Sequence, residues 1–256
     1  MCLIILAYEA HPDYRLIVAA NRDEFYDRPT RPLAYWDDSL KLLAGRDEKA
    51  GGTWLAVTAG GRMAAITNYR DPARLRADAP SRGDLVRDFV AGNLSSLSYM
   101  IRIQRHAQRY NGFNLIAFDS RDLVYYANRQ DKITAIAPGI CGLSNHLLDT
   151  PWPKLQRAKA LLTPLLSGQT PLHRQAVFRL LGDRHQPDDH QLPDTGMGIE
   201  WERILAPIFI SSPTYGTRSS SLVCIGCDGH ITFSERTYLP NRSPGLQYRD
   251  RQYTLT

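Results

Sequence analysis

Cys2 is the residue of this sequence best suited to covalent chemistry. Methionine aminopeptidase usually removes Met1 when the next side chain is as small as that of cysteine. Removal would leave a thiol and a free α-amine on one residue. Ordinary pKa values are about 8.5 for a cysteine thiol and about 7.7–8.0 for an α-amine, so a proton passes between them at little cost. The two groups together could act as a nucleophile with its own base.

The first hairpin of the chain gives Cys2 a neighbour. Residues 2–8 and 15–20 are apolar runs typical of two strands, and the turn between them is centred near Pro12. Counting outward from that turn in an antiparallel pair places Cys2 opposite Arg22, to within about one residue.

Polar residues stand where several apolar runs end. The second run is followed directly by four of them, Asn21, Arg22, Asp23 and Glu24. Such a group is either a solvated turn with a surface ion pair or part of a reaction site. Asn68, Asn145 and Arg218 stand out in three further polar stretches. An asparagine after a strand usually caps a turn, but two asparagines and two arginines also suit thiolate acyl transfer.

Eight short stretches together resemble one known family. They are MCLI, NRDEFYDRPT, AGRD with GGTWL, TNYR, YNGFNL, GLSN, LDTPWPK and YGTRSSS, between residue 1 and about residue 221. The sequence is identified as a member of the Asn-Arg-Asp-Glu family, also called the transport and Golgi organisation protein 2 family. That family resembles the N-terminal-nucleophile hydrolases, in particular the cysteine branch with penicillin V acylase and bile-salt hydrolase.

The resemblance implies a set of catalytic residues: Cys2, Arg22, Asp23, Asn68, Asn145 and Arg218. Cys2 matches the nucleophile, and Asn68 matches the asparagine that helps to form the oxyanion hole. Arginines near the sulfur are expected to favour the thiolate. Residues expected to contact the substrate are Asn21, Glu24, Trp54, Tyr69 and Tyr215.

One departure from the acylase pattern concerns the group that orients the α-amine. The acylases commonly place their Arg and Asp three residues apart, whereas Arg22 and Asp23 are adjacent. Adjacent residues of a regular strand point to opposite faces. Asp23, Glu24 and Asn21 therefore all remain candidates for this role.

The expected fold is α+β. Strand-like runs, helix-like runs, strands, helices and strands follow one another, which favours antiparallel sheets with helices packed on them rather than a βαβ sheet. Helices are expected over 81–92, 96–110, 151–166 and 171–182, and the last strands over 219–227 and 230–239. The resemblance implies a four-layer αββα sandwich of two mostly antiparallel sheets. Residues 1–256 are predicted to form a single N-terminal-nucleophile-hydrolase-like domain.

Composition excludes several classes of protein. An apolar fraction of 43% with 22% charged residues is ordinary for a globular protein, and no apolar run is long enough for a transmembrane helix. The sequence shows no signal peptide, so a cytoplasmic location is expected. The +5 charge comes almost wholly from arginines, which are scattered along the chain with local groups in 70–82 and 102–109. They are interpreted as solvated faces or a rim that attracts an anionic small ligand, and nucleic acid is not expected as a partner.

No metal site is expected. Cys224 and Cys227 form a lone C-x-x-C in a strand-like run, where residues three apart point to opposite faces. His185 and His190 lie in a polar loop. Hydrolysis through Cys2 would need no cofactor.

Two functional hypotheses follow. In the first, the protein is an amidohydrolase that acts on an N-acyl or other small amide through Cys2. In the second, it is a non-catalytic binding or trafficking protein that carries haem or an amphipathic acyl or lipid ligand in the same pocket. The sequence indicates neither the natural ligand nor the oligomeric state.

Overall fold

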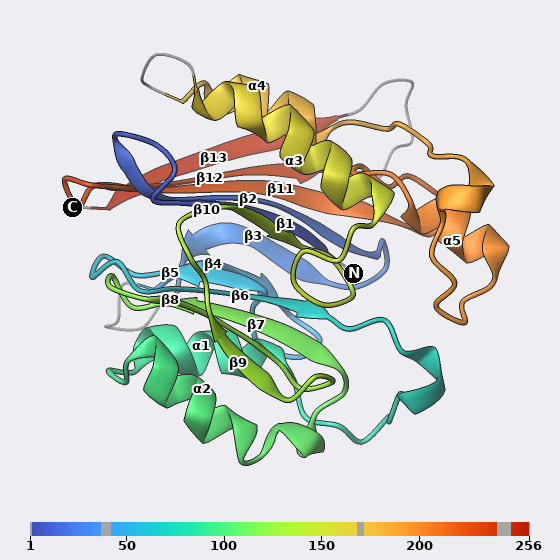
Figure 1. Ribbon diagram of the computed structural model, residues 1–256, viewed down its shortest axis with the longest axis horizontal. Helices are drawn as coiled ribbons and strands as arrows, with labels where there is room; N and C mark the ends of the chain where they lie inside the picture. Colours follow the sequence, from blue (N-terminus) through green and yellow to red (C-terminus); the bar gives the residue numbers. More distant parts are fainter. Residues whose placement is uncertain (1, 37–41, 168–171, 240–246, 256) are drawn as a thin grey trace. The chain divides into compact units, whose positions relative to one another are not determined.

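The computed structural model describes residues 2–36, 42–167, 172–239 and 247–255. The chain forms two compact units, which are described one at a time (Figure 1). Unit 1 comprises Met1–Asp27, Pro138–Ser144 and Leu148–Thr254. Unit 2 comprises Arg28–Ala137, Asn145–Leu147 and Leu255–Thr256.

Unit 1 is built on a six-stranded sheet with the strand order β10-β1-β2-β11-β12-β13. Its strands are β1 (Cys2–Tyr8), β2 (Tyr14–Phe25), β10 (Gly139–Leu143), β11 (Tyr215–Gly226), β12 (Ile231–Tyr238) and β13 (Tyr248–Leu255). The pairings from β10 through β12 are antiparallel. Cys2 pairs with Arg22, as the hairpin count predicts. The nucleophile candidate therefore lies on a central pair of strands.

Two helices cover one face of this sheet: α3 (Pro153–Leu166) and α4 (Arg174–Leu181) (Figure 1). Leu3 and Ile5 of β1 pack into a core with Leu162 of α3 and Phe178 of α4. Because side chains alternate along a strand, Cys2 belongs to the opposite face of the sheet. A shorter helix, α5 (Ile199–Leu205), packs with the start of β11.

Unit 2 is built on a seven-stranded antiparallel sheet in sequence order, β3-β4-β5-β6-β7-β8-β9. Its strands are β3 (Thr30–Tyr35), β4 (Leu43–Asp47), β5 (Leu55–Val57), β6 (Met63–Asn68), β7 (Phe113–Phe118), β8 (Leu123–Ala127) and β9 (Lys132–Ala135). Helices α1 (Gly83–Ala91) and α2 (Ser96–Gln104) pack on it through a core that includes Phe89 and Tyr99. Unit 2 also has the short 3₁₀ turns η1 (Pro72–Arg74) and η2 (Ala107–Arg109), while η3 (Asp189–Gln191) belongs to unit 1.

The α+β prediction is confirmed, since each unit has an antiparallel sheet with helices on it. Each is one sheet layer and one helix layer, the components of the predicted αββα arrangement. The helix predicted over 96–110 is too long, because α2 ends at Gln104 and residues 107–109 form η2. Five elements were not predicted: β3, β4, β10, β13 and α5. That residues 1–256 form a single domain stays a prediction.

Within the described parts of the chain, no helix combines the length and the apolar character needed to cross a membrane.

Candidate active site

Cys2 is the first residue of β1 and is half-buried. Its backbone is fixed on one side by pairing with Arg22 and on the other by the Ser144 hydroxyl, which donates to the Cys2 carbonyl oxygen at 3.3 Å. A residue at a strand terminus that is held from both sides has little freedom to move its backbone. The position suits a nucleophile that must meet a substrate in a fixed orientation.

The pKa of the Cys2 thiol is raised, chiefly by burial and further by the charge of Asp23. The Arg22 guanidinium and the backbone N–H of Asp23 act in the opposite direction. Arg22 therefore favours the thiolate, as expected, but burial outweighs its charge and the net pKa of the thiol is raised. The thiol needs a base to become a nucleophile.

Asp23 is a buried carboxyl beside this thiol, with 1% of its surface exposed. Its Oδ1 accepts a hydrogen bond from the Thr217 hydroxyl at 2.7 Å. Burial raises the pKa of Asp23, whereas the positive charges of Lys154 and Arg22 and the Thr217 bond lower it. The Tyr215 hydroxyl donates to the Asp23 carbonyl oxygen at 2.9 Å, which also fixes the backbone.

Lys154 is a charged residue that the sequence analysis missed, although it ends the quoted stretch LDTPWPK. It lies in the first turn of α3, is 4% exposed, and donates from Nζ to the Leu205 carbonyl oxygen at 2.9 Å. A lysine is rarely this buried without an anionic neighbour. Its charge acts on Asp23, so it belongs to the same electrostatic group.

The two other candidates for orienting the α-amine have different surroundings. Asn21 lies on the helix-covered face, where its Nδ2 donates to the carbonyl oxygens of Leu181 and Ile208, both at 2.8 Å. Its Oδ1 accepts from the Ser220 hydroxyl at 2.6 Å. Asn21 is therefore a buried structural residue. Glu24 is half-buried, and its Oε1 accepts from the backbone N–H of Phe25 at 2.9 Å.

Arg218 lies at an irregularity in β11. Thr217 pairs with Asp23 and Ser219 pairs with Arg22, so Arg218 is the extra residue of a β-bulge. Its Nη1 donates to the Phe25 carbonyl oxygen at 2.8 Å. The pKa of Arg218 is lowered by burial and then by the charge of Arg22, so the two positive charges interact.

Asn68 and Asn145 come together in unit 2. Asn145 is fully buried, and its Nδ2 donates to the Asn68 carbonyl oxygen at 2.9 Å. The Asn145 carbonyl oxygen accepts from the backbone N–H of Arg70 at 2.7 Å. These bonds fix residue 145 against the end of β6. Tyr69 lies beside them, and its ring packs on that of His146 with centroids 5.0 Å apart.

The structure thus brings the predicted residues together as two groups. In unit 1 these are Cys2, Arg22, Asp23 and Arg218, with Tyr215 beneath Asp23; in unit 2 they are Asn68, Asn145 and Tyr69. Trp54 is different, because it packs on the helix-side core of unit 2 and against Gly45. Across the described residues, no group of three or more His, Cys, Asp or Glu is placed to bind a metal ion.

The fold has a counterpart among solved structures. The C2A mutant of conjugated bile acid hydrolase from Clostridium perfringens superposes with a TM-score of 0.50, covering 100% of this chain and 97% of that chain. Only 8% of residues are identical, so the likeness concerns the fold. The chain has the α+β fold of the N-terminal-nucleophile hydrolases.

Sequence comparison defines the family. A family model described as Transport and Golgi organisation 2 matches residues 1–240. The Transport and Golgi organization protein 2 homolog of Bos taurus is 40% identical over 259 residues, 93% of this chain and 94% of that protein. The Homo sapiens homolog is 36% identical over 275 residues, 100% of this chain and 99% of that protein. The chain belongs to the Transport and Golgi organisation 2 family.

Proposed function

We propose that the protein is an N-terminal-cysteine amidohydrolase that cleaves an N-acyl or other small amide. The observation that carries the proposal is the arrangement of Cys2 beside Arg22 and the buried carboxyl of Asp23, on adjacent strands of one sheet. The fold it shares with a bile acid hydrolase supports the same reaction class. The role given below to Asn68 rests on the family resemblance, which also matches Asn145 to the second asparagine of the pattern.

The proposed reaction begins once Met1 has been removed. The α-amine of Cys2 takes the thiol proton, which is needed because the thiol pKa is raised. The sulfur then attacks the amide carbonyl, and Asn68 with a backbone N–H stabilises the oxyanion, at about 3 kcal/mol for each donor. The α-ammonium gives its proton to the leaving nitrogen as the C–N bond breaks. Water hydrolyses the resulting thioester, with the α-amine again acting as base.

We assign to Asp23 the role of orienting the α-amine of Cys2. A carboxylate near an ammonium stabilises it and keeps it oriented. Asn21 is committed to two backbone carbonyl oxygens, and Glu24 is bonded to its own neighbour, whereas the charge of Asp23 acts on Cys2. The charge of Lys154 lowers the pKa of Asp23 and so favours its ionised form, against the burial that raises this pKa.

The test joins intact mass, labelling and turnover. We expect mass spectrometry to show loss of Met1, an electrophilic acyl probe to label Cys2, and a panel of fluorogenic N-acyl amides to include a substrate. Cys2→Ser should lose turnover by at least about 100-fold. Cys227→Ser is the matched control, because Cys227 is an exposed thiol at the end of β11 and should not change turnover. Retained Met1 with an unlabelled Cys2 would contradict the proposal.

A ligand carrier is the second candidate, favoured by an apolar surface beside Arg218. Phe25 is 45% exposed and packs edge-on against Tyr215 at 5.0 Å, while its carbonyl oxygen holds Arg218. An apolar ring next to a guanidinium suits haem or an acyl chain with a carboxylate. Haem titration followed by absorbance, and displacement of a fluorescent fatty acid, would test this. No binding in either assay, with amide turnover lost in Cys2→Ser, would dismiss the carrier.

A further inference from the structure

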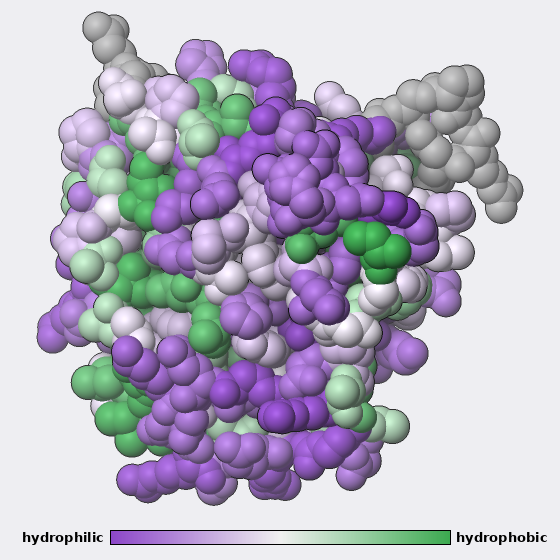
Figure 2. Space-filling view, turned by 45° about the vertical axis from the view of Figure 1, so that its right-hand side comes forward, coloured by the Kyte–Doolittle hydropathy of each residue, from purple (hydrophilic) through white to green (hydrophobic). Residues whose placement is uncertain are grey.

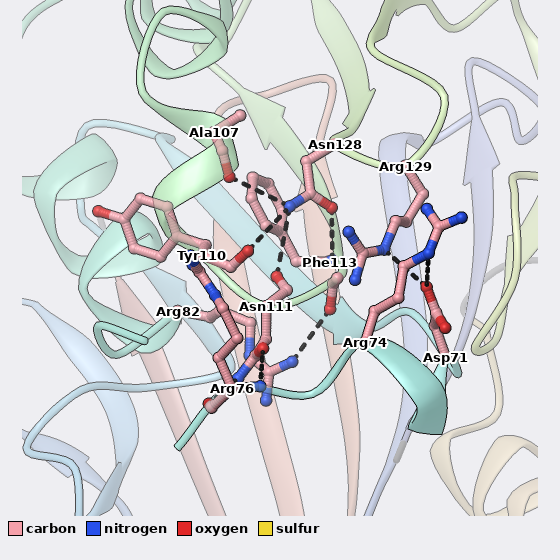
Figure 3. Close-up of polar contacts among 11 residues, drawn as sticks. Asp71, Arg74, Arg76, Arg82, Ala107, Tyr110, Asn111, Phe113, Asn128 and Arg129 are labelled. Atoms are coloured by element: carbon pink, nitrogen blue, oxygen red, sulfur yellow. Dashed lines mark hydrogen bonds and ion pairs between the residues drawn. The ribbon is translucent and has the colours of Figure 1, made fainter. Parts of the chain in front are cut away.

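Two arginine-rich segments that are distant in sequence lie against each other in unit 2. Arg76 donates from Nη2 to the Gln108 carbonyl oxygen at 3.1 Å and also bonds the carbonyl oxygen of Arg109. The side chain of Asn111 bonds the backbone of Arg76 in both directions, at 2.9 and 2.8 Å (Figure 3). The loop that holds residue 75 is thereby joined to the chain that follows α2.

Exposed aliphatic residues accompany these arginines. Leu75 is 62% exposed, and Leu97 and Ile101 of α2 are 51% and 42% exposed. Leu97 and Ile101 are four residues apart, so they share one face of the helix. Tyr99 and Met100 of the same helix are buried in the core.

The exposed face of α2 continues into the basic region. Arg105 follows Ile101 by four residues, and Arg109 lies in the next turn, where its carbonyl oxygen holds Arg76. Arg76, Arg105 and Arg109 are all exposed. The resulting basic–apolar surface is defined by Leu75, Arg76, Leu97, Ile101, Arg105 and Arg109.

The charge of this surface is only partly balanced, by Asp78 near Arg76 and by the Asp131 carboxylate, which accepts from Gln104 at 3.2 Å. The segment 97–109 contains three arginines and no acidic residue. In the neighbouring loop, the Asp71 carboxylate is shared by Arg129, at 3.1 Å, and Arg74, at 3.8 Å (Figure 3). One carboxylate between two guanidinium groups leaves a positive balance there as well. The surface therefore attracts an anionic partner.

We propose that the basic–apolar surface docks the protein onto membranes rich in anionic lipid. The three aliphatic side chains would enter the boundary between headgroups and acyl chains, and the arginines would bind lipid phosphates. Such docking needs no shaped groove, because separate side chains can each insert. Figure 2 shows hydrophobic residues in small groups among hydrophilic ones on the face it draws. Nucleic acid fits less well, because aliphatic side chains do not provide the aromatic stacking that bases use.

Co-sedimentation with vesicles tests the proposal. We expect binding to vesicles of phosphatidylcholine mixed with phosphatidylserine, little binding to phosphatidylcholine alone, and weaker binding at high salt. Arg105→Gln with Arg109→Gln should lower the partition coefficient by about 25-fold, since each arginine near an anionic surface contributes about fivefold. Leu97→Ser with Ile101→Ser should lower it by about tenfold.

Matched controls remove similar groups elsewhere on the surface. Arg179→Gln with Arg249→Gln changes the net charge by the same amount at two exposed sites of unit 1, and Ile199→Ser removes a side chain that is 46% exposed. These variants should bind like the wild type, and all variants should keep its circular dichroism and thermal midpoint. Equal losses in the control and test pairs would overturn the assignment. Binding of polyaspartate without vesicle binding would assign the surface to an acidic protein instead.

Discussion

Asn21, Arg22 and Asp23 are consecutive in β2 and have distinct surroundings. Asn21 joins the sheet to the carbonyl oxygens of Leu181 and Ile208. Arg22 pairs with Cys2 and is 5% exposed. Asp23 bonds Thr217 and is influenced by the charge of Lys154. Strand alternation separates Arg22, which shares the face of Cys2, from Asn21 and Asp23 on either side of it.

Asp23→Asn tests whether the Asp23 carboxyl lowers the stability of the folded protein while it serves the proposed reaction. The raised pKa means that the folded state binds the Asp23 proton more tightly than the unfolded state does. The stability linked to this group is complete below its ordinary pKa and is lost as pH rises through the folded-state pKa. We expect Asp23→Asn to raise the free energy of unfolding at pH 7, and the difference to vanish toward pH 4.

Urea unfolding at both pH values measures this difference. Amide turnover by the same variant should fall by at least about 100-fold, because an amide cannot hold the α-ammonium by charge. Thr217→Val is the useful comparison, since it removes the hydrogen bond to Asp23 and keeps the carboxyl. The linkage argument would be refuted if the free energy of unfolding of Asp23→Asn, relative to that of the wild type, were lower at pH 7 than at pH 4.

Lys154 illustrates what single-residue inspection misses. The residue stands in a stretch that carries the family resemblance, but lysines are normally exposed, and its type gives no reason to expect burial. Burial arises because Pro153 begins α3 and the Lys154 side chain reaches the carbonyl oxygen of Leu205. That contact joins positions 51 residues apart, which local sequence patterns do not reveal.

At the scale of elements, the β-bulge in β11 determines where Arg218 lies relative to β2. A regular strand would pair residue 218 with β2, whereas the register shift leaves Arg218 outside the ladder. The extra residue increases the local twist and redirects the side chain. The hairpin of β1 and β2 could be counted from the sequence because its turn is local. The bulge could not, because it depends on pairing between strands almost 200 residues apart, as in the bond between Thr217 and Asp23.

Gly216 next to this bulge is predicted to be intolerant of a side chain. A Cβ at this position would collide with the Tyr26 hydroxyl and lie 2.7 Å from the Ile210 carbonyl oxygen. We expect Gly216→Ala to lower the free energy of unfolding by about 2–3 kcal/mol through overpacking. Denaturant unfolding checks the value. Gly60→Ala is the control, with nothing nearer than the Thr58 hydroxyl at 4.0 Å, and equal losses in the two variants would contradict the steric explanation.

Several elements escaped prediction for one reason: their sequences are not strongly periodic. Strand β13 has a mainly exposed pattern with four charged or amide residues in succession, from Arg249 to Gln252. It is a strand because the sheet edge next to it offers hydrogen-bond partners, and tertiary context overrides weak local preference. By contrast, the fully buried runs of β7 and β8 were recognised directly from their apolar residues.

At the scale of the whole molecule, the chain passes repeatedly between its two units. Strands β1 and β2 precede unit 2 in sequence, while β10 returns afterwards to pair Leu143 with Ile4. Residues Asn145–Leu147 then belong again to unit 2, where Asn145 bonds Asn68. Neither unit is a continuous segment, so the sheet of unit 1 is completed only after most of unit 2 has been made.

This interleaving predicts one cooperative unfolding transition for the whole chain. Tryptophan fluorescence can report on each unit separately, because Trp36 and Trp54 belong to unit 2 and Trp152 and Trp201 to unit 1. Phenylalanine replacement of either pair leaves reporters in the other unit only. We expect coincident midpoints in urea for the two double variants, measured beside circular dichroism to correct for any destabilisation. Two well-separated transitions would contradict the single-domain prediction.

The sequence by itself determined the α+β class, the family and the pairing of Cys2 with Arg22, because apolar runs, motif spacing and hairpin turns are properties of neighbouring residues. Only the tertiary structure decided that Lys154 is buried near Asp23, that Arg218 forms a bulge, and that Asn145 is bonded to Asn68. Each of these depends on desolvation or on contacts between distant segments. Such effects arise when the chain folds, and no short stretch of sequence contains both partners.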